Sequence, residues 1–269
     1  GLFSLYLKNK YKLPYIISEH WTIFLDSDPT KFNFVEQYFV NKIIKNANVI
    51  CPVSDHLKIA IQKNVKFQNY ITVPNVVDTQ LFMPKANNND VINFLHLSNL
   101  KDEHKNITGI INVVEKLSKC RTDFKLTIAG DGTIEKYKKY ASQLKIPKEL
   151  ILFEGKKTTS EVAELMNNHD AFLLFSNYES FSVVIAEAWT SGLPVISSVS
   201  GGLTNDITPK NGLQVAVGDE NDLFQKLNKT IDNITQYNKQ EIAENSRKVY
   251  SYDVVGKQFY NIYTKIVST

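Results

Sequence analysis

Short apolar segments alternate with longer segments of helical periodicity along most of this chain. Brief apolar runs between turn residues are typical of buried strands, whereas apolar positions that repeat every three or four residues are typical of helices. The pattern predicts strands at residues 15–17, 49–51, 70–73, 91–97, 125–129, 150–153, 171–175, 194–197 and 212–215. It predicts helices at residues 34–45, 54–63 (with Ser54 as N-cap), 107–118, 134–144, 159–167, 181–191 and 221–232, and a mostly helical tail at 241–269. Such an alternation predicts an α/β fold with parallel sheets.

A polar stretch divides this alternation into two series. Residues 85–90 include three consecutive asparagines, and Pro74 and Pro84 precede them, which is a composition typical of a linker. A domain boundary is therefore expected near residue 86. The six strands that follow alternate with helices, which favours one doubly wound domain with right-handed crossovers.

Composition and charge narrow the function classes. The chain has 269 residues, of which 43% are hydrophobic and 22% are charged, as in ordinary globular proteins. Its 31 basic and 28 acidic residues give a net charge of +3, and the lysines are scattered, so nucleic acid is not an expected partner. The apolar runs are far shorter than the roughly 20 residues that cross a bilayer. Cys51 and Cys120 lack the spacing of a disulfide framework, which favours a location in the reducing cytosol. No cysteine or histidine has metal-ligand spacing, and neither a protein-bound metal nor another cofactor is expected.

The loops that follow the strands are where a site is expected, because ligands bind beyond the carboxyl ends of the strands in an open parallel sheet. Residues 176–182 form such a loop, ahead of a helix that carries Glu187 and ends at Gly192 and Pro194. The amino end of that helix suits a phosphate, because it presents free amides and a partial positive charge. Glu187 lies about five residues further on, roughly 8 Å along the axis at ~1.5 Å per residue, which suits a ribose beside a pyrophosphate.

The same segment carries a resemblance to a known family. Glu179, seven intervening residues and Glu187, with the string AEAWTSGLPVISSVSGG around it, are similar to the donor site of the retaining glycosyltransferases of family 4, or glycosyl transferases group 1. The resemblance runs from about Tyr15 to Val217. It implies the GT-B fold, which has two Rossmann-like doubly wound parallel-sheet domains, the first of them incomplete in this chain.

The resemblance also implies roles for the residues of this segment. Glu179 is expected to bond hydroxyls of the donor sugar, and Glu187 is expected to hold the ribose hydroxyls. The backbone amides expected to face the sugar and the phosphates are those of Phe181, Ser182 and Val183.

The loop after the strand at 91–97 supplies further donor contacts. Lys105 is similar to the family lysine that neutralises the donor pyrophosphate, because a cation on a flexible stem can follow the charge of the leaving group. Ser98 and Asn99 are expected at the donor as well. Many members carry arginine at the position of Asn99, and Lys101 is the candidate that would replace its charge.

Three other loops complete the expected site. Gly130 and Gly132 match a family turn in which glycine lets the backbone approach a ligand. Gly155 and Lys156 belong to a loop that resembles the one beside the nucleotide base. His20 matches a family histidine close to the sugar and acceptor, where a neutral imidazole can orient a hydroxyl; packing against Trp21 is the alternative. The residues expected to be catalytic are Glu179, Lys105 and His20.

The resemblance further implies that the chain is truncated at its amino terminus. Residues 1–85 are then the carboxyl half of the acceptor-side Rossmann-like domain, 86–252 the nucleotide-sugar donor domain, and 253–269 a helix that crosses back to the first domain. The chain also opens without a methionine, as a fragment would. Whether the fragment is itself active is left open.

The expected function is that of a retaining glycosyltransferase of the hexosyltransferase type (EC 2.4), acting in polysaccharide, lipopolysaccharide or glycolipid synthesis for the cell envelope. Its partners would be a nucleotide-diphosphate sugar and a saccharide or lipid-linked acceptor. No residue stands out as a covalent nucleophile. The expected location is cytoplasmic, and Lys8, Lys10 and Lys12 leave open a peripheral contact with the inner face of the plasma membrane. The alternatives are a non-catalytic nucleotide-sugar-binding module and a GT-B relative such as a nucleotide-sugar epimerase.

Overall fold

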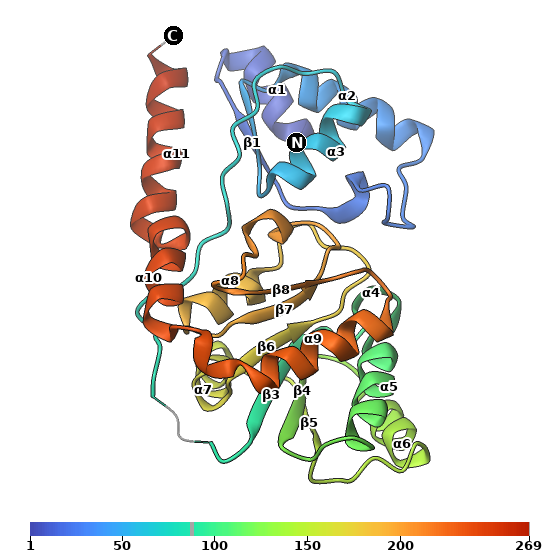
Figure 1. Cartoon of the computed structure of the whole chain (residues 1–269). Coiled ribbons are helices and arrows are strands. Elements are labelled where there is room, and N and C mark those ends of the chain that lie inside the picture. Colours follow the sequence, from blue (N-terminus) through green and yellow to red (C-terminus); the bar gives the residue numbers. More distant parts are fainter. Residues whose placement is uncertain (87–88, 269) are drawn as a thin grey trace.

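The computed structural model describes residues 1–86 and 89–268. Positions 87 and 88 of the predicted linker and position 269 of the predicted tail lie outside the described residues. The chain forms two α/β units, each with a parallel sheet, and the first unit lies above the second in Figure 1.

The first unit has a two-stranded sheet in which Ile16 pairs with Val49. Its elements are α1 (Leu2–Tyr11), β1 (Ile16–Glu19), the 3-10 helix η1 (Thr22–Phe24), α2 (Phe34–Asn46), β2 (Val49–Pro52) and α3 (Asp55–Asn64). Ser54 caps α3 as predicted, because its Oγ accepts a 3.1 Å hydrogen bond from the Leu57 amide. The hydrophobic pattern predicts no element over residues 2–11, so α1 is a difference from the sequence analysis.

The predicted strand at residues 70–73 is wrong. Tyr70 forms a single bridge with Ile50, and the Val73 amide donates to the Pro52 carbonyl at 3.0 Å. A regular parallel ladder would also need an amide donor at position 52, and proline has none. The segment therefore runs beside β2 without becoming a third strand.

The second unit has a six-stranded sheet in the order β5-β4-β3-β6-β7-β8, with every neighbouring pair parallel. The strands are β3 (Ile92–Ser98), β4 (Phe124–Gly130), β5 (Ile151–Glu154), β6 (Ala171–Leu174), β7 (Val195–Ser198) and β8 (Gly212–Val215). The chain builds outward from β3 in one direction and then outward from β6 in the other. The carboxyl ends of β3 and β6 are therefore the switch point, where a doubly wound sheet binds its ligand.

Helices connect these strands. They are α4 (Asp102–Lys105), α5 (Ile107–Ser118), α6 (Glu135–Gln143), α7 (Thr159–Asn168), α8 (Val183–Thr190) and α9 (Glu220–Asp232). On α5, Ile107, Ile110, Ile111 and Val114 recur at helical spacing and are buried in one cluster with residues of the sheet. The helix predicted at 181–191 begins later, at Val183, because Ser182 has a φ of 72°, which is left-handed and outside the α-helical region.

The two units pack on each other across the switch point. Leu57 of α3 belongs to the same buried cluster as Phe181 and Leu203 of the second unit. The Ser54 hydroxyl also donates a 2.6 Å hydrogen bond to the Ser180 carbonyl. The first unit therefore contacts the loop that leads into α8.

The tail returns to the first unit. After the 3-10 helix η3 (Ile234–Gln236) come α10 (Lys239–Tyr250) and α11 (Tyr252–Val267), and α11 rises beside the first unit in Figure 1. Val255 and Ile262 of α11 are buried together with Val49 and Cys51 of β2. Among the described residues, no helix has the length and apolar character that a membrane span requires.

Candidate active site

Lys105 and Glu179 form a buried ion pair at the switch point. Lys105 ends α4, in the loop after β3, and Glu179 lies in the loop after β6. The Lys105 ammonium donates a hydrogen bond to Glu179 Oε1, and the two residues are only 8% and 7% exposed. Two residues that the sequence analysis took from separate motifs are thus in direct contact, because their strands are neighbours in the sheet.

The Glu179 loop is supported from behind by the segment after β7. The Glu179 amide donates to the Ser200 carbonyl at 2.9 Å, and Glu179 forms a bridge with Gly201. Gly201 has a φ of +118°, and a Cβ there would overlap the Glu179 carbonyl oxygen. The start of the segment after β7 therefore supports the Glu179 backbone.

The amino end of α8 follows the same loop. Its first amides have no acceptor within the helix, as at any helix start. Val183 is 37% exposed, whereas Phe181 is buried with its ring edge against Tyr250. The Ser182 hydroxyl is buried and, within the part of the chain that the structure describes, has no hydrogen-bond partner. The structure thus places the three predicted amides at the start of a helix, and Val183 is the most exposed of the three residues.

Four predicted donor residues line one cavity of about 260 Å³. They are Ser98, Gly130, Lys156 and Glu187. Ser98 and Gly130 end β3 and β4, Lys156 lies in the loop after β5, and Glu187 belongs to α8. Lys105 and Glu179 are not among the residues that line this cavity, although they follow the neighbouring strands β3 and β6 of the same sheet.

Glu187 is a poorly solvated carboxyl group. Burial raises its pKa to about 7. No hydrogen bond from a described residue offsets this burial. At neutral pH the group is therefore divided between its ionised and protonated forms, which makes it sensitive to a ligand that hydrogen-bonds to the carboxylate.

Glycine is required at some predicted positions and not at others. Gly130 has a φ of +150°, and a Cβ there would overlap the Ser98 carbonyl oxygen. Gly132 has a φ of +154° and packs against Asn99 and Leu100. Around Gly155, in contrast, nothing lies within 4 Å of an added Cβ, so crowding does not explain that glycine. The neighbouring Lys156 pairs with Asp131 at 2.8 Å.

His96 fixes the hydroxyl of Ser98. Its Nδ1 donates to the Leu173 carbonyl at 2.9 Å, so its Nε2 is the acceptor for the Ser98 hydroxyl, also at 2.9 Å. Burial lowers the pKa of His96 to about 4, which keeps the ring neutral. Ser98 Oγ in turn accepts from the Leu100 amide at 3.1 Å. Toward the cavity the Ser98 hydroxyl can therefore only accept a hydrogen bond.

Other predicted residues lie elsewhere. His20 contacts Ser18 Oγ at 2.9 Å and lines a cavity of about 450 Å³ that is formed by residues 1–44 alone. Asn99 Oδ1 accepts from the Lys101 amide at 3.3 Å, and neither residue lines the cavity that holds Glu187. The structure therefore does not bring these three residues to the cavity that Glu187 lines.

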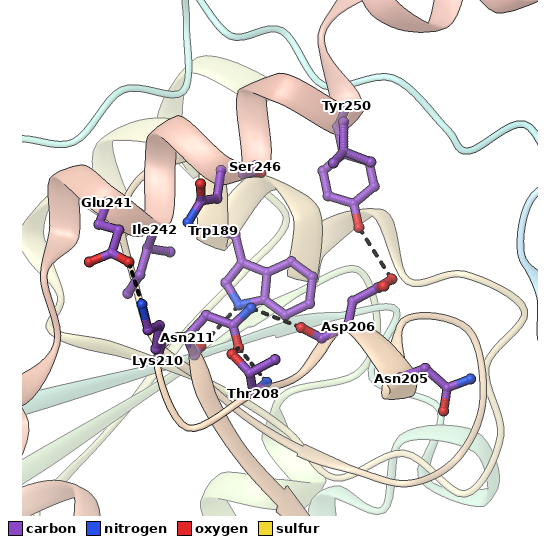
Figure 2. A pocket seen from close by; sticks show the side chains of 12 residues that line it. Trp189, Asn205, Asp206, Thr208, Lys210, Asn211, Glu241, Ile242, Ser246 and Tyr250 are labelled. Atoms are coloured by element: carbon purple, nitrogen blue, oxygen red, sulfur yellow. Dashed lines mark hydrogen bonds and ion pairs between the residues drawn. The ribbon is translucent and has the colours of Figure 1, made fainter.

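Two further cavities border the site or lie behind it. One of about 400 Å³ lies between the units and includes His56, Asn177 and Ser200. The other, of about 350 Å³, lies at the far end of α8, between the loop that contains the 3-10 helix η2 (Thr204–Asp206) and α10 (Figure 2). There the Tyr250 hydroxyl lies 3.4 Å from Asp206 (Figure 2). Across residues 1–86 and 89–268, no group of three or more metal-ligating side chains is present.

Sequence reasoning missed the side chains that join the two key loops. His104 stacks on Tyr178 with ring centroids 4.3 Å apart, and Asn177 bonds to the backbone of residues 103 and 104. His104 directly precedes Lys105, and Tyr178 directly precedes Glu179. The only signal in the sequence was that each lies next to a residue predicted to be catalytic.

Comparison with known proteins identifies the family. The family model described as glycosyl transferases group 1 matches residues 77–249, so this chain belongs to that family. A glycosyltransferase of Methanocaldococcus jannaschii is 26% identical over 236 residues, which make up 87% of this chain and 63% of that protein. The chain spans between 43% and 63% of the length of three curated relatives that it matches.

Solved structures identify the fold. Sucrose-phosphate synthase from Thermosynechococcus elongatus superposes with a TM-score of 0.85 at 17% identity, over 100% of this chain and 71% of that one. The Anabaena protein HepE in complex with UDP-glucose superposes with a TM-score of 0.81 at 17% identity, over 98% of this chain and 76% of that one. The predicted GT-B fold and the predicted membership in glycosyl transferases group 1 are therefore confirmed.

Proposed function

We propose that this chain contains the donor-binding part of a retaining glycosyltransferase that uses a nucleotide-diphosphate sugar. The observation that carries the proposal is the buried Lys105–Glu179 pair at the β3/β6 switch point, beside the start of α8. Family membership and the nucleotide-sugar complex of a structural neighbour support it.

Each group has a chemical task in this proposal. The bond between the anomeric carbon and the diphosphate oxygen breaks, and its electron pair leaves with the diphosphate. Lys105 and the first amides of α8 neutralise this developing charge, which is the effect of a preorganised oxyanion site. Glu179 accepts hydrogen bonds from sugar hydroxyls, and Glu187 accepts them from the ribose.

The acceptor hydroxyl then bonds to the anomeric carbon on the face that the diphosphate leaves, and its proton departs with the diphosphate. This step preserves the anomeric configuration without a covalent enzyme intermediate. We assign the acceptor to the saccharide or lipid-linked class used in cell-envelope synthesis, and the location to the cytoplasm or the inner face of its membrane. Neither a metal nor another cofactor is part of the proposal.

Titration calorimetry with UDP, GDP and their sugars, together with nucleoside diphosphate release from each sugar, tests the proposal. We expect saturable binding of one nucleotide class and a drop in turnover of ~100-fold or more in Lys105→Ala, as for the loss of one charge-stabilising group. Lys119→Ala is the matched control, because Lys119 is an exposed lysine paired with Glu115. Equal turnover in the Lys105 variant and the wild type would contradict the assignment.

A second candidate is a nucleotide-sugar-binding module without turnover. It is favoured by one observation, which is that the chain spans less than two thirds of its curated relatives. Binding of a nucleotide sugar with no release of diphosphate, both alone and with saccharide acceptors, would select this candidate.

A further inference from the structure

The ion pair depends on two separate loops. Lys105 belongs to the loop after β3 and Glu179 to the loop after β6, 74 positions further along the chain. Lys105 ends α4, a helix of four residues whose N-cap, Lys101, makes no side-chain capping bond. A single helical turn of this kind is not stable by itself. The Asp102 carboxylate accepts hydrogen bonds from the amide and hydroxyl of Thr108 in α5, which fix the start of α4. Contacts with the neighbouring loop hold its other end, where Lys105 lies.

Backbone contacts supply part of this support. The Asn177 amide donates to the His104 carbonyl at 2.8 Å, and the Asn177 side-chain amide donates to the Glu103 carbonyl at 2.9 Å. Both bonds run from the Glu179 loop to α4. The acceptors are two carbonyl oxygens at the end of this short helix, where carbonyls have no hydrogen-bond donor within the helix.

His104 supplies the side-chain part. Its ring is stacked on Tyr178, with 4.3 Å between centroids and 13° between planes. His104 Nε2 lies 2.7 Å from the Tyr178 carbonyl, which can only accept, so this nitrogen carries the proton. The same nitrogen lies 4.0 Å from Glu179 Oε1. One imidazole thus contacts the residue before Glu179 by its face and by its edge.

We propose that His104 is a positioning residue that holds Lys105 and Glu179 in their mutual geometry by clamping α4 to Tyr178. The proposal rests on the proposed function of the ion pair. The clamp acts before any donor binds, so it preorganises the two charges instead of adding a contact to the substrate. Its loss should reduce the chemical step more than donor affinity, because in the proposed function Lys105 neutralises charge that develops on the diphosphate only as the bond breaks.

Four variants separate the stacking from the hydrogen bond. His104→Phe keeps an aromatic ring but loses the donor, His104→Gln keeps a donor but loses the stacking, and His104→Ala loses both. Tyr178→Phe is the matched control, because it keeps the ring and the backbone carbonyl that accepts the bond. Hydrogen exchange of residues 98–106 and 175–182 is measured in each, together with kcat and KM for the donor.

We expect Tyr178→Phe to match the wild type and His104→Ala to lose protection in both loops. A misplacement of about 1 Å can cost ~100-fold in rate, so kcat of His104→Ala should fall by ~10- to 100-fold while KM changes by less than ~3-fold. His104→Gln and His104→Phe should each recover part of both effects. They keep the proposal testable if the alanine variant fails to fold.

If hydrogen exchange in both loops is unchanged in the folded His104 variants, the proposal that His104 positions the ion pair is wrong. A loss confined to KM, or a Tyr178→Phe variant as impaired as His104→Ala, would also overturn it. The exchange measurement needs no substrate, so it distinguishes the two proposals. Loss of protection in a protein without transferase turnover would refute the proposed function and leave the clamp intact.

Discussion

Replacing the partly buried carboxyl group of Glu187 with an amide should stabilise the protein at alkaline pH. Burial raises the Glu187 pKa from 4.5 to about 7, so the folded state binds this proton more tightly than the unfolded state does. As pH rises from 4.5 through 7, the free energy of unfolding of the wild type therefore decreases. Each pKa unit corresponds to ~1.36 kcal/mol, so the loss approaches about 3 kcal/mol by pH 8.

Glu187→Gln has nearly the same shape but no charge to desolvate. We expect it to be more stable than the wild type by up to about 3 kcal/mol at pH 8 and nearly equal to it at pH 5. In thermal unfolding this is a rise of about 6 °C or more at pH 8, at ~2 to 4 °C per kcal/mol for a chain of this size. The gain should accompany weaker donor binding, because the amide replaces the carboxylate that accepts hydrogen bonds from the ribose in the proposed function.

The assay is thermal and denaturant unfolding of both proteins from pH 5 to pH 9. Glu149→Gln is the control, since Glu149 is an exposed glutamate whose replacement should leave stability unchanged at every pH. A Glu187→Gln variant that is no more stable at pH 8 than the wild type would refute the reasoning that burial, uncompensated by hydrogen bonds, sets the properties of this site.

Two further perturbations test the architecture around the site by thermal unfolding. Gly130→Ala should lower the free energy of unfolding by ~3 kcal/mol or more, because the added Cβ overlaps the Ser98 carbonyl oxygen at a positive φ. Gly155→Ala should change it by less than ~0.5 kcal/mol, because nothing lies near the added Cβ. Equal effects of the two variants would contradict this account. Lys105→Met should cost about 3 to 5 kcal/mol by leaving Glu179 buried without a partner, and the additional change Glu179→Leu should restore most of that stability. A double variant no more stable than Lys105→Met would show that unpaired charge is not the cause.

Local chemistry alone was enough to predict several elements. The strand predicted at 212–215 is β8, and the helix predicted at 107–118 is α5. The Ser54 cap was also predictable, because an N-cap depends on the residues of one helical turn. The strand predicted at 70–73 and the helix start predicted at 181 were wrong, each because of one residue. Pro52 interrupts the ladder beside residues 70–73, and Ser182 delays the start of α8.

In the candidate site, too, the sequence identified individual residues, whereas the structure showed which of them are in contact. The family resemblance points to Glu179, Glu187 and Lys105, and membership in glycosyl transferases group 1 is confirmed. The structure alone shows that Lys105 pairs with Glu179 and that Glu187 lines a cavity with Ser98, Gly130 and Lys156, to which neither member of the pair contributes. His20 also lies in a different cavity from Glu187.

The sequence by itself thus determined the periodic elements, the family and the identity of the charged groups, since these depend on residues a few positions apart. Only the tertiary structure decided which of those groups meet. The order β5-β4-β3-β6-β7-β8 places β3 beside β6, and this adjacency brings His104 onto Tyr178 across 74 positions of chain. Contacts of that kind are set by strand order and by packing between loops, which leave no periodic trace in either segment.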